Sequence, residues 1–175
     1  MRYFLILLPL LFLQCKSGNK NTSDLNAEIT ALEAEIGANP GSAQDKITGL
    51  LAKYEEFAAS PENDQNQVVD YLLRAGEMAS LINQPHKSLV YYEKILTEHA
   101  GHPKASTALF MKAYTLDDKL KKYDEAKVVY EDFLAKYPND DFADDTQFLL
   151  DNLGKSEEEI IKLFEEKAAA QNVNQ

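Results

Sequence analysis

Three similar stretches recur at equal intervals along the chain: YEEFAASPEND at residues 54–64, YEKILTEHAGH at residues 92–102 and YEDFLAKYPND at residues 130–140. Each begins with Tyr and Glu and places a bulky apolar residue three positions after the tyrosine, and successive tyrosines are 38 residues apart. A fixed period of this length is typical of arrays in which every repeat is one supersecondary unit. One such unit cannot bury its apolar face alone, so stacked copies share a continuous core.

Each repeat is predicted to contain two helices joined by a turn. In the third repeat, apolar residues follow the helical period over residues 109–116, and the polar sequence LDDKLKKYD then interrupts them. A second apolar face runs over residues 126–137, and Pro138 ends it because proline disfavours helix in the residue before it. The repeat therefore predicts an antiparallel helical hairpin.

Small residues mark where the two helices of a hairpin approach each other. In the second repeat these are Gly76 and Ser88, twelve residues apart. In the third they are Ala113 and Ala126, thirteen residues apart, which predicts a turn that is one residue longer. A larger side chain at such a position would push the helices apart.

This spacing resembles that of the tetratricopeptide repeat, most clearly in the third hairpin. The resemblance extends from Asp45 to Tyr137 and implies an all-α fold: a solenoid of αα-hairpins closed by C-terminal capping helices. The residues expected to pack the repeats together are Tyr54, Phe57, Gly76, Ser88, Tyr92, Ala113, Ala126, Tyr130, Phe133 and Pro138.

The two ends of the predicted repeat domain, residues 24–170, are less regular. Residues 24–37 carry Leu25, Ile29, Leu32 and Ile36 at spacings of 4, 3 and 4, which suit either the missing first helix or a short coiled-coil seam. At the C-terminal end, one helix should stop at Gly154, and residues 171–175 read as a tail. A further capping helix should begin with a capping box, Ser156 and Glu159, and bury Ile160, Ile161 and Phe164.

The N-terminus resembles a bacterial lipoprotein signal. Arg2 is followed by eleven apolar residues, too few to span a bilayer, and then by Cys15, the one cysteine of the chain. The resemblance implies a signal peptide at 1–14, a lipidated Cys15 and a linker to residue 23. Lys16 follows the cysteine where an aspartate would imply inner-membrane retention, so the resemblance implies sorting to the outer membrane. Residues 16–20, KSGNK, lack the acidic residues of surface-export signals, which implies the periplasmic face.

Composition and motifs exclude several classes of function. The formal net charge of −11 opposes nucleic-acid binding, which requires basic residues to neutralise phosphates. Nucleophile-elbow, Walker and dinucleotide-binding motifs do not occur, so neither an enzyme nor a cofactor is expected. His99 and His102 have a spacing that metal ligands could use, but they lie in a predicted loop without a cysteine, and we expect no metal site.

The candidate binding site is the groove that first helices line in proteins with this repeat. Arg74 and Lys112 are 38 residues apart, and together they could hold an acidic segment of a partner. Asp70, Glu77 and Thr115 would lie beside them. The alternative is that both cations are ordinary surface charges, with Arg74 paired to Asp70 one helical turn away.

Together these features predict a membrane-anchored scaffold that binds another envelope protein through its repeats. Anchored repeat proteins of this kind resemble the lipoprotein of outer-membrane β-barrel assembly and the Tol–Pal coordinator, although the chain is shorter than the first and lacks the coiled coil of the second. The alternative is a lipoprotein that binds a glycan or cell-wall fragment, which two exposed parallel aromatic rings in one cleft would favour.

Overall fold

The structure is a computed structural model that describes residues 22–38, 44–156, 158–163 and 165–166, and every regular element in these ranges is helical. The predicted signal peptide, Cys15 and the tail at 171–175 lie outside the described residues. The elements are α1 (Thr22–Ala38), α2 (Gln44–Ala58), α3 (Gln65–Leu81), α4 (Pro85–Glu98), α5 (Ala105–Tyr114), the π-helix η2 (Thr115–Lys119), α6 (Tyr123–Lys136) and α7 (Ala143–Asp151).

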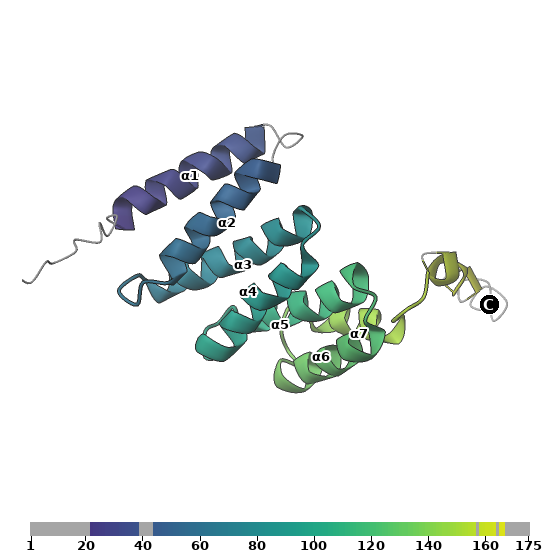
Figure 1. Cartoon of the computed structure of the whole chain (residues 1–175). Coiled ribbons are helices and arrows are strands. Elements are labelled where there is room, and N and C mark those ends of the chain that lie inside the picture. The colour runs from purple at the N-terminus through teal and green to yellow at the C-terminus, as the bar shows by residue number, and fades with distance from the viewer. Residues whose placement is uncertain (1–21, 39–43, 157, 164, 167–175) are drawn as a thin grey trace, which may run out of the picture.

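The helices form a stack in which each packs against its neighbour along the chain, from α1 to α7 (Figure 1). The hairpins are α1–α2, α3–α4 and α5–α6, and α7 packs against α6. We call α1, α3, α5 and α7 the first helices and α2, α4 and α6 the second helices. None of the described helices is both long and apolar enough to cross a membrane. The predicted all-α solenoid of hairpins is confirmed.

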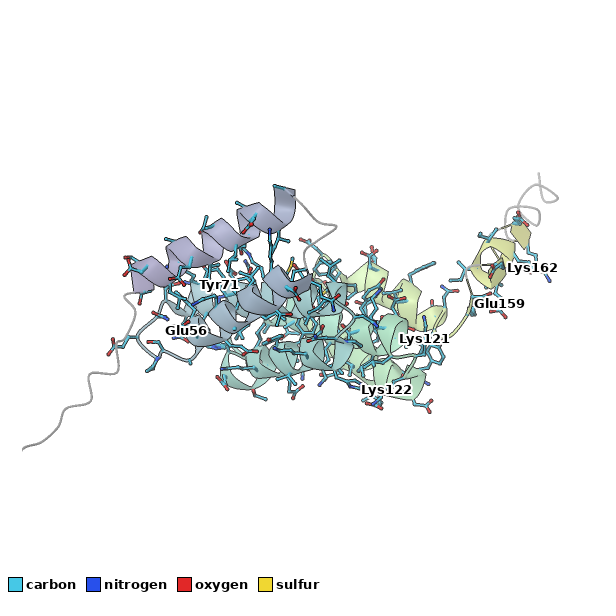
Figure 2. The ribbon with its side chains drawn as sticks, turned by 45° about the horizontal axis from the view of Figure 1, so that its top comes forward. Glu56, Tyr71, Lys121, Lys122, Glu159 and Lys162 are labelled. Carbon is cyan, nitrogen blue, oxygen red and sulfur yellow. The ribbon has the colours of Figure 1, made fainter. Side chains whose placement is uncertain are left out.

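Helix α1 completes the first hairpin. Leu25, Ile29 and Ile36 are buried in the same core as the apolar residues of α2 and α3. Near the start of α1, the hydroxyl of Tyr71 on α3 donates a 2.9 Å hydrogen bond to the Asn26 side chain. Figure 2 shows Tyr71 in this region, close to α1. The 4-3-4 spacing of apolar residues therefore serves packing within the solenoid.

The recurring tyrosines lie at the centre of the second helices. Tyr54, Tyr92 and Tyr130 are each at most 1% exposed, and Phe57 and Phe133 are fully buried one turn later. The aromatic ring of Phe57 meets Tyr71 of the next hairpin edge to face, with centroids 4.8 Å apart. The 38-residue period thus places a buried tyrosine on each second helix, and these rings bury a large apolar area in the core.

Gly76 and Ser88 lie at the closest approach of α3 and α4. The hydroxyl of Ser88 donates a buried 2.7 Å hydrogen bond to the carbonyl oxygen of Gly76. The counterpart residues in the third hairpin, Ala113 and Ala126, are fully buried and belong to one apolar cluster with Tyr130. Small side chains allow these helix backbones to approach each other.

The extra residue of the third hairpin lies in a π-helix, where the sequence predicted a longer turn. After Tyr114 the helix continues to Lys119 with wider turns, and the amide of Leu120 donates a 3.1 Å hydrogen bond to the carbonyl of Thr115. Such one-residue insertions produce the rare π-helical geometry. The expected turn is therefore displaced to residues 120–122, where Lys121 has a φ of 53°.

The C-terminal end differs in part from the expectation. Ser156 and Glu159 form the reciprocal capping-box hydrogen bonds, at 2.7 and 3.3 Å. The helix that follows stands apart from the stack, as the positions of Glu159 and Lys162 in Figure 2 show, and Ile161 is 57% exposed. The predicted burial of Ile161 was therefore wrong, whereas Ile160 is half-buried and lines a pocket beside α7. The side chain of Phe164 lies outside the described residues.

Candidate partner-binding surface

A pocket of about 340 Å³ opens between α1 and α3, the first helices of neighbouring hairpins. Leu50 and Tyr54 of α2 form part of its wall, and carboxylates from both first helices line it. The complete lining is Glu33, Ile36, Gly37, Leu50, Tyr54, Arg74, Glu77 and Met78. The pocket thus combines an apolar wall with charged groups, as sites that receive a partner side chain do.

One carboxylate organises the charged side of this α1–α3 pocket. Glu33 accepts a 2.5 Å hydrogen bond from the hydroxyl of Tyr54 and forms a 2.8 Å ion pair with Arg74. Burial, together with the hydrogen bond to Glu33, raises the pKa of Tyr54 far above its usual value, so the phenol remains a donor. The hydrogen bond to Glu33 also raises the pKa of Arg74, whose guanidinium remains charged.

The structure does not place Arg74 and Lys112 at equivalent positions. The π-helix follows Ala113, so the first helices correspond at an offset of 37 residues, which pairs Gly76 with Ala113 and Arg74 with Met111. The side chains accordingly point to different elements. Arg74 pairs with Glu33 on α1, whereas Lys112 pairs with Glu93 on α4 at 2.6 Å. The expectation of two matching groove cations was wrong because it carried the offset of the second helices over to the first.

Two other residues of the expected groove have different partners. Asp70 contacts Lys104 at 2.5 Å, so the alternative pairing of Asp70 with Arg74 was also wrong. Thr115 is only 2% exposed, and its hydroxyl donates to the carbonyl of Met111 at 2.7 Å. Thr115 therefore has no surface to offer a partner. Of the expected groove residues, Arg74 and Glu77 share the α1–α3 pocket.

A second pocket, of about 330 Å³, lies between η2 and α7 near the opposite end of the stack. Its walls include Tyr114 at the end of α5, Asp117 and Asp118 of η2, and Phe148 of α7. Tyr130 donates a 3.3 Å hydrogen bond to Asp117, much as Tyr54 donates to Glu33. We call this the α5–α7 pocket. Both pockets thus lie between first helices, and in both a buried tyrosine holds a carboxylate.

Two of the histidines lie at the loop that joins α4 and α5. Nε2 of His102 lies 3.0 Å from the side-chain oxygen of Asn66. Nδ1 of the same ring accepts a hydrogen bond from the backbone amide of Lys104. His99 lines a third pocket beside Pro61 and Lys94. Within the described ranges, no group of three or more His, Cys, Asp or Glu side chains is placed to hold a metal ion.

Two aromatic rings lie nearly parallel to Phe110 of α5, but they stack against it. Phe110 stacks on Phe142 with centroids 4.6 Å apart and an interplanar angle of 12°, and it is also nearly parallel to Tyr114 at 6.4 Å. Phe142, the residue before α7, thus covers one face of Phe110 and anchors α7 to α5. This arrangement differs from two rings that frame an open cleft for a sugar.

Glu33 and Asp117 are the two carboxylates that accept from buried tyrosines, and sequence analysis singled out neither of them. Asp117 was part of the sequence assigned to a turn, and only the thirteen-residue spacing of Ala113 and Ala126 indicated an irregularity there. Glu33 belongs to a helix joined to α2 through residues 39–43, so no fixed spacing connects it with Tyr54. An acid that lies beside a buried tyrosine can be identified only once the packing of the helices is known.

Pro138 was expected among the packing residues, yet its side chain is exposed. It follows Tyr137, the residue that caps α6, and the helix ends at Lys136. Pro138 therefore acts on the backbone, by preventing continuation of the helix, and contributes little to the core.

Comparison with protein families matches residues 107–140 to the tetratricopeptide repeat. The matched range begins in α5, contains η2 and α6, and ends just before α7. Neither the curated proteins nor the solved structures contain a significant match to the chain. The matched hairpin and the stack around it identify the described part of the chain as a helical solenoid with tetratricopeptide-like repeats.

Proposed function

We propose that this protein is a membrane-anchored scaffold that binds another envelope protein through its first helices. Tetratricopeptide repeats generally mediate contacts between proteins, and the repeat match supports that class of function. The lipoprotein-like sequence around Cys15 supports an anchor, and Lys16 supports sorting to the outer membrane. The lack of acidic residues at positions 16–20 supports its periplasmic face. In this proposal the repeats bind and position a partner, and they carry out no catalysis.

The observation that carries the proposal is the α1–α3 pocket. It combines an apolar wall that includes Ile36 and Leu50 with the charged groups of Glu33, Arg74 and Glu77. An apolar side chain of a partner could be buried against the apolar wall, while the charged groups fix its orientation. Since Glu33 already neutralises Arg74, Glu77 gives this pocket a net negative charge. A partner segment with an acidic side chain is therefore disfavoured here.

Affinity capture from solubilised membranes tests this function. The tagged full-length chain should retain a specific protein, identified by mass spectrometry, and Glu77→Lys should reduce its recovery at least about tenfold by reversing the charge of the pocket. Glu131→Lys is the matched control, because Glu131 is exposed on the second helix α6 and undergoes the same charge reversal. Equal recovery with wild type and Glu77→Lys would contradict the assignment of this pocket.

The anchor has a separate test. Wild-type protein should fractionate with membranes, whereas Cys15→Ala should remain unprocessed or appear in the soluble fraction, because the acylated sulfur would be absent. Cys15→Ser retains a similar size and should behave in the same way. If the wild type and both variants distributed identically, the lipid anchor would have to be abandoned, while the capture experiment would still decide the binding function.

A further inference from the structure

The α5–α7 pocket is built from unusual backbone on several sides. Asp117 and Asp118 belong to the π-helix η2, and Lys121, which also lines the pocket, has a φ of 53°. Gly154 has a φ of +75°, and a Cβ at this glycine would lie 3.5 Å from the ring of Tyr123. Rare backbone geometry is concentrated at functional sites, because the surrounding structure must stabilise it.

Three aromatic side chains line this pocket: Tyr114 at the end of α5, Tyr123 at the start of α6 and Phe148 on α7. All three retain exposed surface, and Phe148 is 43% exposed. Aromatic faces carry a negative electrostatic potential, which attracts ammonium and guanidinium groups. The rings come from three separate helices, and the fold itself therefore brings them to one cavity.

Asp117 is a carboxylate of this pocket that forms no ion pair among the residues that the structure describes. It accepts a hydrogen bond from the hydroxyl of Tyr130 at 3.3 Å. Burial raises the pKa of Asp117, although the hydrogen bond from Tyr130 and the charge of Lys121 oppose this effect. A positively charged group in the pocket would stabilise the ionised carboxylate.

The other charged groups at the pocket have partners of their own. Asp118 pairs with Lys119 at 2.7 Å and with Lys121 at 3.7 Å. The ammonium of Lys155 donates to the carbonyl of Asp151 and to the side-chain oxygen of Asn152. These contacts direct the lysines to neighbouring acceptors and leave Asp117 available. Figure 2 shows Lys121 at the end of the stack nearest the C-terminal helix.

We propose that the α5–α7 pocket binds the guanidinium or ammonium group of a basic side chain from the partner polypeptide. In this arrangement Asp117 is the counter-ion, and Tyr114, Tyr123 and Phe148 are the aromatic walls. The inference rests on the proposed function and adds the chemistry of one partner side chain to it. The net charge of −11 supports this choice, because it attracts a basic partner at long range. The volume of about 330 Å³ accommodates a long side chain.

A titration followed by nuclear magnetic resonance tests this chemistry. The ¹⁵N-labelled full-length chain, in detergent, is titrated with N-acetyl-arginine methylamide and separately with N-acetyl-citrulline methylamide, a neutral analogue of nearly the same shape. We expect the arginine probe to shift amide signals of Tyr114, Asp117 and Phe148, and to bind at least about tenfold more tightly than citrulline. Equal affinity for both probes would overturn the proposal, as would shifts confined to other parts of the solenoid.

Charge variants supply the control for this titration. Asp117→Asn should weaken the arginine probe about tenfold and leave the citrulline probe unchanged. Asp144→Asn makes the same change in net charge at an exposed position in the first turn of α7, and should have no effect. An equal loss with both variants would indicate non-specific attraction and overturn the proposal. Thermal melting of each variant verifies that the fold is retained.

The outcome is independent of the test of the proposed function. If a partner is captured through Glu77 but the arginine probe does not bind, the pocket chemistry is wrong and the scaffold function stands. If the arginine probe binds through Asp117 but no partner is captured, the scaffold function is wrong and the cation pocket stands. Capture of a partner that Asp117→Asn weakens and Asp144→Asn does not would support both.

Discussion

Gly76 faces the ring of Tyr92 so closely that a Cβ at this glycine would lie 2.3 Å from Cε1 and 2.4 Å from Cζ. Glycine inside a helix ordinarily costs about 0.5–1 kcal/mol relative to alanine. The contact with Tyr92 outweighs this preference, because both residues are buried between α3 and α4, where the ring has little room to move. Gly76 is therefore required by the packing of this hairpin.

We predict that Gly76→Ala destabilises the fold by about 1–3 kcal/mol, as overpacked core substitutions do. The matched control is Gly49→Ala. Gly49 lies inside helix α2, and a methyl group added there would meet no atom within 4 Å, so this change should stabilise the protein by about 0.5–1 kcal/mol through helix propensity. Urea denaturation of both variants measures the difference. Stabilisation by both substitutions would contradict the close approach.

Loss of the hydroxyl should affect the stability of the fold differently at Tyr92 than at Tyr54. Tyr92 has a buried hydroxyl with no hydrogen-bond partner in the part of the chain that the structure describes, whereas Tyr54 and Tyr130 donate to Glu33 and Asp117. Tyr92→Phe should be neutral or stabilising, and Tyr54→Phe should cost about 1–2 kcal/mol because it removes a bond to a charged acceptor. Melting temperatures that fall equally for both variants would show that Tyr92 also has a partner.

Ala126 tests the register of the third hairpin. It is fully buried against the cluster that contains Ala113 and Tyr130, so Ala126→Leu should destabilise the protein by about 1–3 kcal/mol. Ala135→Leu on the same helix is the control, because Ala135 is exposed and should tolerate leucine within about 0.5 kcal/mol. If Ala126→Leu has the same melting temperature as the wild type, α5 and α6 do not contact each other at this residue.

Asp117 should make the stability of the fold depend slightly on pH, in the direction opposite to that of most aspartates. Burial raises its pKa in the folded state above the unfolded value, so its contribution to stability is present in full below the unfolded pKa and is lost as pH rises through the folded pKa. Asp117→Asn retains an acceptor for Tyr130 and should remove this part of the dependence. The side-chain carboxyl carbon, followed by nuclear magnetic resonance, reports the pKa directly. A value below that of an unfolded aspartate would contradict the predicted direction.

The sequence was sufficient to predict the hairpins, since the positions of Tyr54, Tyr92 and Tyr130 follow from periodicity, and periodicity follows from stacking. It was insufficient for the first-helix surface. One inserted residue in η2 makes the offset between α3 and α5 37 residues, where the second helices have 38, and a one-residue shift turns a helical side chain by about 100°. Lys112 consequently faces α4 and pairs with Glu93. Whether an inserted residue enters a turn or widens a helix depends on tertiary packing.

The long-range partners of charged side chains were the other part that the sequence could not supply. Arg74 had a suitable acid one turn away at Asp70, yet it pairs with Glu33 on α1, while Asp70 pairs with Lys104 from the next hairpin. Exposed ion pairs contribute little free energy, so sequence proximity alone does not select among them. The arrangement of neighbouring hairpins determines which charged residues form ion pairs, and periodicity alone does not specify that arrangement in detail.

The central claim is that a protein partner binds along the first helices. Site-specific photo-crosslinking in cells tests it most directly, with the photoreactive residue placed at Glu77 on α3 or, as a control, at Val128 on α6. Val128 is 64% exposed on a second helix and Glu77 is exposed on α3, so the photoreactive group is accessible at both positions. We predict that Glu77 yields one discrete crosslinked protein and Val128 does not. A discrete crosslinked protein from Val128, together with none from Glu77, would contradict the account.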